Sequence, residues 1–391
     1  MLLAFLTIFV IYISFRIGID IYESFYIKKE AAKDAVLMEK KEYLEAGLYA
    51  VYKKIIDIFD ALASLFIVVI ILSGGLWLIN YLDNNNSLIT IFAYFALVYI
   101  VSLPIMIYSK IIDKRFGFNK ASWKLFVIDE IKKIILFVLI GGIIFWGLIY
   151  FIENFENWWI VGFVFVFIVI LLVNILYPIF MSLFNKFTPL ENEELKNDIE
   201  NIMEKVGFKA NGIFVMDASK RDSRLNAFFG GFGKTKRVVL FDTLVEKLTP
   251  NEIIAVLGHE LGHFKHKDII KNIGMMGIMM FGLFFIIGHL PDSLFQEAHI
   301  KKTAGNILVL AFIIGEVYFY ALSPIINLIS RHNEFAADEM GAELGSSKDL
   351  KSALIKLIKE NKSFPKSSKI YSIMYHSHPS VLERIEELDK K

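Results

Sequence analysis

The chain has 391 residues, of which 55% are hydrophobic and 36 are Phe, and its mean hydropathy of +0.53 is far above that of a soluble protein. Its formal net charge of +1 provides no basic excess to neutralise phosphates, so nucleic acid is not an expected partner. With no cysteine, the chain has no disulfide, thiolate nucleophile or cysteine-bound metal.

Apolar runs indicate an integral membrane protein, because a helix of about 20 apolar residues crosses a bilayer core. The first run lacks a basic flank and a small-residue cleavage site, so we expect a span there and not a signal peptide. The sequence therefore predicts a mainly α-helical protein in a lipid bilayer, with seven spans at 2–21, 58–81, 88–108, 134–152, 158–177, 273–290 and 307–330.

Lys and Arg are concentrated in alternate connections between these runs. Residues 16–54 carry one Arg and seven Lys, and 109–133 carry one Arg and six Lys, whereas 82–87 and 153–157 contain neither. By the positive-inside tendency, the N-terminus is expected outside and the polar segments 178–272 and 331–391 in the cytoplasm. The lysine-rich, cysteine-free composition favours a prokaryotic cell membrane, and in a eukaryote the endoplasmic reticulum would be expected.

Four parts follow from this pattern: five spans in 1–177, a polar insert at 178–272, two spans in 273–330 and a polar tail at 331–391. Neither polar part is large enough for a comfortable core of its own. We expect the insert and the tail to pack together as one small α+β domain.

The insert begins with a helical pattern over 192–206 and then changes to short β-branched and aromatic runs. Two of these, 212–216 and 237–241, are expected strands, and the segment between them supplies a third strand and a glycine-rich turn. Thr249, Pro250 and Glu252 then form the start signal of a helix, with a capping threonine, proline at the first helical position and a glutamate that returns to the cap. This helix is expected to run to Asp268.

The helix carries H-E-x-x-H as His259, Glu260 and His263. Residues four apart share a helix face, so both imidazoles can meet one ion while Glu260 reaches a water beside it. This is the arrangement of a hydrolytic zinc site, in which the glutamate is the general base. The alternative is an amphipathic helix with polar residues at a membrane interface.

A catalytic zinc site with two histidines needs a third protein ligand and an open position. His266 is short of a full turn beyond His263, and Glu316 lies inside the last predicted span. Glu334 is the best-formed candidate, because Asp338 follows one turn later on the same helix face and could orient an imidazole. The candidates considered are His266, Glu316, Glu334, Asp338 and His378.

The sequence resembles the type I integral-membrane zinc CAAX prenyl proteases, which are related to a smaller heat-shock membrane protease with fewer spans. The resemblance covers most of the chain, in the family's order. It is carried by RFGFNK (115–120), YPIFMSLFNKFTPLE (177–191), NAFFGGFGKTKRVVLFDTL (226–244), VLGHELGHFKHKD (256–268), SRHNEFAADEMGA (330–342) and SHPSVLERI (377–385).

The resemblance implies one zinc ion per chain, bound by His259, His263 and Glu334, with Glu260 as general base. It implies that Asp338 orients a histidine ligand or assists proton transfer. It also implies a large chamber enclosed by the seven helices within the membrane.

The resemblance further implies a substrate-binding region. His378 matches a position that donates to the developing oxyanion, and Arg384 a position that lines the site. Asn226 and the strand RVVLF, which includes Val238, Val239 and Leu240, match the part of the family that holds the substrate backbone as an added edge strand.

The function predicted from these features is a zinc endopeptidase that cuts near the C-terminus of a prenylated CAAX-type or other membrane-associated peptide. A quality-control protease of the same fold, degrading misfolded membrane proteins, would share all of this chemistry. A transporter or scaffold with a structural zinc would not need Glu260, and a protease homologue that only binds peptides would not need the intact motif.

Overall fold

The computed structural model describes residues 1–230 and 236–390, and the glycine-rich turn predicted after the third strand falls on 231–235, outside the described residues. Within these ranges, seven helices are long and apolar enough to cross a membrane, which confirms the predicted number of spans. They are α1 (Leu2–Ala31), α2 (Lys40–Ile70) with α3 (Leu76–Leu82), α4 (Ser87–Arg115), α5 (Trp123–Leu136) with α6 (Gly142–Asn154), α7 (Trp158–Ser182), α11 (Asp268–Gly288) and α13 (Ala304–Leu344).

Two of the seven are interrupted by a π-helical turn, at Ile71–Gly75 between α2 and α3 and at Phe137–Gly141 between α5 and α6. Several helices are longer than the apolar runs that predicted them. The helix α13 has 41 residues, and a span needs only about 20. Its last turns therefore project beyond the apolar stretch and reach the polar part of the molecule.

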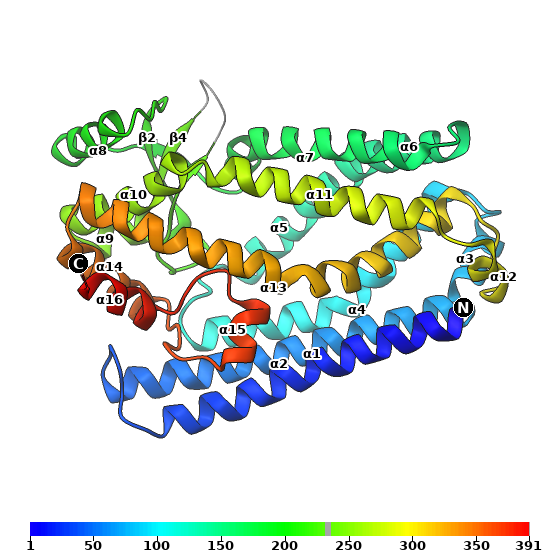
Figure 1. Cartoon of the computed structure of the whole chain (residues 1–391), viewed down its shortest axis with the longest axis horizontal. Helices are drawn as coiled ribbons and strands as arrows, with labels where there is room; N and C mark the ends of the chain where they lie inside the picture. Colours follow the sequence, from blue (N-terminus) through cyan, green and yellow to red (C-terminus); the bar gives the residue numbers. More distant parts are fainter. Residues whose placement is uncertain (231–235, 391) are drawn as a thin grey trace.

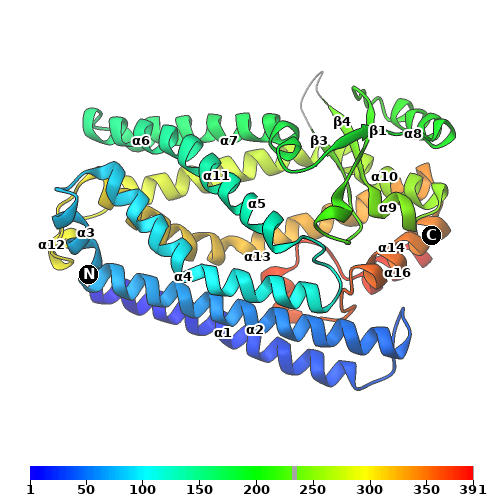
Figure 2. The same ribbon diagram turned by 180° about the vertical axis from the view of Figure 1, so that it is seen from behind.

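The helices lie in an elongated arrangement, with α1 and α2 side by side along one side and α6, α7 and α11 along the other (Figure 1). The helix α13 runs between these groups along the length of the molecule, as the reverse view also shows (Figure 2). The N-terminus lies at one end of the molecule and the β-sheet at the opposite end.

The sheet has four strands in the order β1-β2-β4-β3. The strand β2 pairs parallel with β4, whereas β1 with β2 and β3 with β4 are antiparallel. The short strand β1, directly after α7, was not predicted. The bounds are β1 Phe187–Pro189, β2 Ile213–Met216, β3 Ala227–Gly230 and β4 Arg237–Phe241.

Around the sheet the polar insert and the tail share one hydrophobic core, in which Ile199, Leu240 and Leu257 meet Ala353 of the tail. The predicted helix at 192–206 is α8, capped by the side chain of Asn192. The helices of this end are α8 (Glu193–Lys205), α9 (Asp242–Lys247), α10 (Pro250–Lys265), α14 (Ser347–Glu360), α15 (Lys369–Tyr375) and α16 (Val381–Asp389), and α12 (Asp292–Glu297) lies at the other end.

The helix α10 begins as predicted, with a capping box between Thr249 and Glu252 and Pro250 at its first position. Its predicted end at Asp268 is wrong. The helix stops at Lys265, Lys267 adopts a left-handed conformation with φ of 58°, and Asp268 starts α11. This break separates the helix that carries the H-E-x-x-H motif from the next membrane helix.

Candidate metal centre

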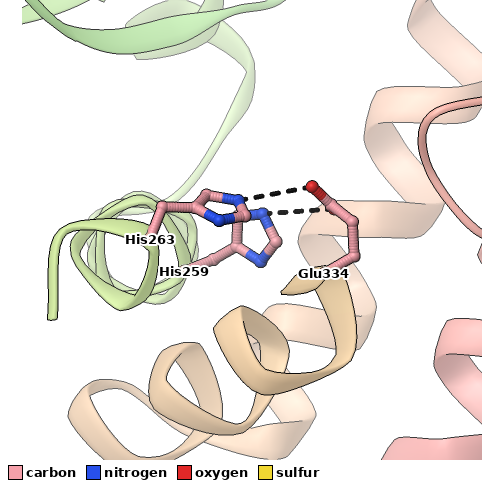
Figure 3. Close-up of side chains that lie close together, drawn as sticks. All are labelled: His259, His263 and Glu334. Carbon is pink, nitrogen blue, oxygen red and sulfur yellow. Dashed lines mark ion pairs between the residues drawn. The ribbon is translucent and has the colours of Figure 1, made fainter. Parts of the chain in front are cut away.

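The side chains of the predicted site come together from two helices. His259, Glu260 and His263 lie on α10, and Glu334 and Asp338 lie on the projecting end of α13. Figure 3 shows both imidazoles pointing toward the Glu334 carboxylate. His378 joins them from the loop after α15 and Arg384 from α16.

Close packing of α10 on α13 makes this meeting possible. A Cβ atom added to Gly262 would lie 2.8 Å from Ala337 Cα, and one added to Gly258 would lie 3.2 Å from Gly341 Cα. Side chains at these two positions would hold the helix backbones apart. The glycines of L-G-H-E-L-G-H therefore bring the two histidines within reach of Glu334.

Each imidazole lies close to one oxygen of the Glu334 carboxylate. His259 Nε2 lies 3.5 Å from Glu334 Oε2, and His263 Nε2 lies 3.3 Å from Glu334 Oε1. Ligand atoms about 2.1 Å from a tetrahedral zinc lie roughly 3.4 Å from one another. Among the described residues, His259, His263 and Glu334 are the group that could hold a metal ion.

Two carboxylates orient the imidazoles. His259 Nδ1 lies 2.9 Å from Asp338 Oδ1, and His263 Nδ1 lies 3.0 Å from Asp268 Oδ2. Each carboxylate accepts a hydrogen bond from the Nδ1–H group, which directs Nε2 of the ring toward Glu334.

Glu334 is 2% exposed, and its Oε2 atom has no hydrogen-bond partner among the described residues. A buried carboxylate oxygen without a donor is unfavourable, and a cation between it and the imidazoles would satisfy it. Burial lowers the pKa of His263, but hydrogen bonds to Glu334 and Asp268 outweigh this and raise it to about 9. A bound metal ion would take the place of that proton, so these residues fit a metal site.

Glu260 is only partly buried, and its carboxylate has no hydrogen bond or ion pair with any residue that the structure describes. It is therefore free to hold a water or a peptide group. His378 is 62% exposed, and its Nδ1 lies 2.8 Å from Glu334 Oε1. His378 thus lies at the solvent-exposed side of Glu334.

Arg384 has its guanidinium turned toward Asp338. Its Nε donates to Asp338 Oδ2 at 2.8 Å, its Nη2 donates to Oδ1, and its Nη1 lies 3.6 Å from Glu334 Oε2. The guanidinium that was predicted to contact substrate is therefore engaged with Asp338 and with the candidate metal ligand Glu334.

One functional residue was missed. Asp268 orients His263 only because the chain turns at Lys267, and a continuous helix would have carried Asp268 away. A carboxylate five residues after the second histidine lies off its face on a continuous helix, so the spacing gave no signal. The rejected candidates stay apart from the cluster: His266 caps α10, and Glu316 accepts hydrogen bonds from Tyr12 and Ser64.

The predicted edge strand is wrong. RVVLF forms β4, which is paired on both sides, and its Val238, Val239 and Leu240 are 0% exposed. The strand at this edge of the sheet is β3, which pairs only with β4 among the described residues. Asn226, directly before β3, has an exposed side chain.

Comparisons with known proteins agree with this arrangement. The model of peptidase family M48 matches residues 189–391. A model described as the CAAX prenyl protease N-terminal domain, with five membrane helices, matches residues 28–186.

The chain is 36% identical over 318 residues to CAAX prenyl protease 1 of Saccharomyces cerevisiae, covering 74% of this chain and 69% of the yeast protein. It is 32% identical over 334 residues to the human CAAX prenyl protease 1 homolog, covering 74% and 70%. The crystal structure of S. mikatae Ste24p superposes with a TM-score of 0.88 at 30% identity, over 99% of this chain and 98% of that one.

Proposed function

The chain belongs to peptidase family M48 as a membrane metalloprotease of the CAAX prenyl protease 1 type, and we propose from that premise that it is a zinc endopeptidase for prenylated CAAX-type proteins. The observation that supports this most is the cluster of His259, His263 and Glu334 with Glu260 beside it. The proposed cut follows the modified cysteine and releases the last three residues.

The proposed zinc ion, one per chain, would be held by the Nε2 atoms of His259 and His263 and by the Glu334 carboxylate. When bound, it supplies a Lewis acid that acidifies water and polarises the peptide carbonyl. Asp338 and Asp268 hold the imidazoles in the ligating tautomer, and Arg384 holds Asp338 in place.

Glu260 acts as the general base. Its carboxylate takes a proton from the attacking water and then delivers a proton to the leaving amine, which requires a side chain without competing ion pairs. His378, on the accessible side of Glu334, donates to the oxygen that becomes negative as the carbonyl is attacked.

The substrate backbone pairs with β3 as an added strand, with Asn226 at the start of this edge. Main-chain pairing holds an extended peptide whatever its side chains, and leaves the residues around the cut free to vary. The strand proposed to pair with the substrate is therefore β3 and not β4, which was predicted from the sequence.

We place the N-terminus outside and the sheet end in the cytoplasm, because the Lys- and Arg-rich connections gather on that side. A prenylated protein would meet the site there with its lipid in the bilayer. The division into parts 1–177, 178–272, 273–330 and 331–391 belongs to the same proposal.

The test is a peptidase assay with zinc-loaded protein and a farnesylated CAAX peptide, with an unprenylated copy alongside. We expect release of the C-terminal tripeptide, faster from the farnesylated peptide. A preparation that degrades an unfolded membrane protein but does not cut this peptide would contradict the proposed prenylated substrate. It would favour the quality-control protease instead.

A further inference from the structure

A cavity of about 250 Å³ lies between the α1 and α2 helices and the segment that joins α14 to α15. We call it the lysine cavity, because its walls carry four lysines, Lys53, Lys54, Lys362 and Lys366, and one carboxylate, Glu23. None of these residues belongs to the metal centre. A lysine in this lining that is not already neutralised would favour an anionic group.

The lysines differ in how far they are already paired. Lys54 donates to Asp20, Asp57 and Tyr371, which uses all three of its protons. Lys366 and Lys362 each pair with a glutamate, at 2.9 and 3.0 Å.

Within the described part of the chain, the carboxylate of Glu23 forms no ion pair with these lysines, and its hydrogen bonds come from serine donors. It accepts hydrogen bonds from the Ser367 hydroxyl at 2.7 Å and the Ser368 amide at 3.0 Å. Lys53 has the weakest partners of the four: it donates to the Ser109 hydroxyl at 3.2 Å, and its nearest carboxylate, Asp113, is 3.9 Å away. Lys53 is therefore the cavity lysine best able to receive a new carboxylate.

The cavity adjoins the start of the edge strand. Asn361, which lines it, accepts from the Leu225 amide at 2.9 Å and donates to the Leu225 carbonyl at 3.3 Å. Leu225 lies two residues before β3. A peptide paired with β3 that continued past Ala227 would thus approach Asn361.

A short stretch of chain joins the cavity lining to the metal ligands. His376 lines it, and His378 Nδ1 lies 2.8 Å from Glu334 Oε1. Two residues of chain span at most about 7 Å, and three extended residues about 10 Å. The loop from His376 to His378 therefore connects the cavity lining to the cluster of metal ligands.

The opposite end of β3 lies beside apolar side chains. A Cβ atom added to Gly230 would lie 3.4 Å from Pro178 of α7, and the rings of Phe228 and Tyr177 pack edge to face. This end thus meets the last turns of an apolar membrane helix. A lipidated residue upstream of the cut suits this end, and a charged terminus suits the lysine cavity.

We propose that the lysine cavity binds the free C-terminal carboxylate of the substrate, with Lys53 as its ion partner and the peptide antiparallel to β3. This deepens the proposed function and rests on it. Binding of the carboxylate would then fix the distance between the end of the substrate and the peptide bond that is cut. This would explain the release of a tripeptide by a site that binds the substrate mainly through its backbone.

The test compares two farnesylated peptides of the same sequence, one ending in a carboxylate and one in an amide, with zinc-loaded full-length protein. We expect the wild-type kcat/KM to be about 10- to 100-fold higher for the acid, the range that a charge-assisted hydrogen bond supplies. Because the ratio is taken within one preparation, it does not depend on the fraction of folded protein.

Variants then assign the effect to the cavity. In Lys53→Gln the ratio should fall below about 3-fold, whereas Lys53→Arg keeps the charge and should keep most of the preference. Lys41→Gln is the matched control, because Lys41 is an exposed lysine on the same helix, outside the cavity lining. Its ratio should equal that of the wild type.

Equal cleavage of acid and amide by the wild type would overturn the carboxylate proposal and leave the proposed function standing. An unchanged ratio in Lys53→Gln would overturn the assignment to this cavity. If the wild type cuts neither peptide while it degrades another membrane protein, the proposed function fails, and this inference fails with it.

Discussion

The Nδ1 atom of His259 lies 2.9 Å from the Oδ1 atom of Asp338, one turn beyond Glu334 on the same helix. One face of α13 thus provides both a metal ligand and the carboxylate that orients a ligand from α10. The arrangement ties metal affinity to the packing of these two helices.

Replacing Asp338 by Asn should weaken zinc binding by 10- to 100-fold, the usual effect of losing a partner of a ligating histidine. The amide removes the charge that pairs with Arg384 and orients His259 less strongly. Competition with a chromogenic chelator measures the affinity. Glu343→Gln, at an exposed position on the same helix, is the control, and equal zinc affinity of D338N and wild type would contradict this role.

Replacing Glu260 by Gln should leave zinc binding intact and lower kcat by about 10²- to 10⁴-fold, the contribution of general acid–base catalysis. Glutamine keeps the shape of the side chain but cannot accept the proton. Zinc content by atomic emission and peptide turnover are measured on the same sample. Turnover within twofold of wild type would show that another group is the base.

Gly262→Ala should separate α10 from α13, because the new methyl group would lie 2.8 Å from Ala337 Cα. Overpacking of this kind costs about 1–3 kcal/mol, and we expect a lower thermal midpoint together with weaker zinc binding. Gly274→Ala on α11 is the control, since its methyl group would meet nothing within 4 Å. If both variants behave alike, the close approach of the helices is not what positions the site.

The sequence could predict what depends on local geometry. The spacing of His259 and His263 sets both on one helix face, and Glu334 could be selected because a second carboxylate follows it by one turn. Asp268 could not be selected, because its position depends on a single left-handed residue, Lys267, which carries no glycine or asparagine signal.

The order of the strands in the sheet could not be predicted from the local sequence, for a different reason. The strand β4 pairs parallel with β2 and antiparallel with β3, so its place in the middle is set by long-range pairing. Short apolar strands such as RVVLF are compatible with an edge or a central position. The burial of Val238 and Val239 on both sides is visible only in three dimensions.

Replacing Asp268 by Asn should weaken zinc binding as in the Asp338 variant, but through the other histidine, His263. We expect a 10- to 100-fold loss of zinc affinity, since His263 loses its charged acceptor. The neighbouring Lys271, which also contacts this carboxylate, provides the control variant Lys271→Gln. A larger loss in Lys271→Gln than in Asp268→Asn would mean that the ion pair, and not the imidazole contact, matters at this turn.

Glu252 gives a pH-dependent contribution to stability at the start of α10. Its carboxylate accepts from the Thr249 amide, the Ser352 hydroxyl and Lys356, which joins α10 to α14. Burial raises the pKa of Glu252, but the hydrogen bonds from Lys356, Ser352 and Thr249 outweigh it and hold the pKa below its usual value. The ionised form is therefore the one that the folded protein favours.

Because the pKa is lower in the folded state, this stabilisation is complete above the unfolded pKa of about 4.3 and is lost as the pH falls through the folded value. Glu252→Gln should lower the free energy of unfolding at pH 7 by about 1–3 kcal/mol, the range for a hydrogen bond to a charged group. Thermal midpoints in detergent at pH 7 and pH 4 measure this. The difference between wild type and variant should shrink at pH 4, and a constant difference would show that the charge of Glu252 is not involved.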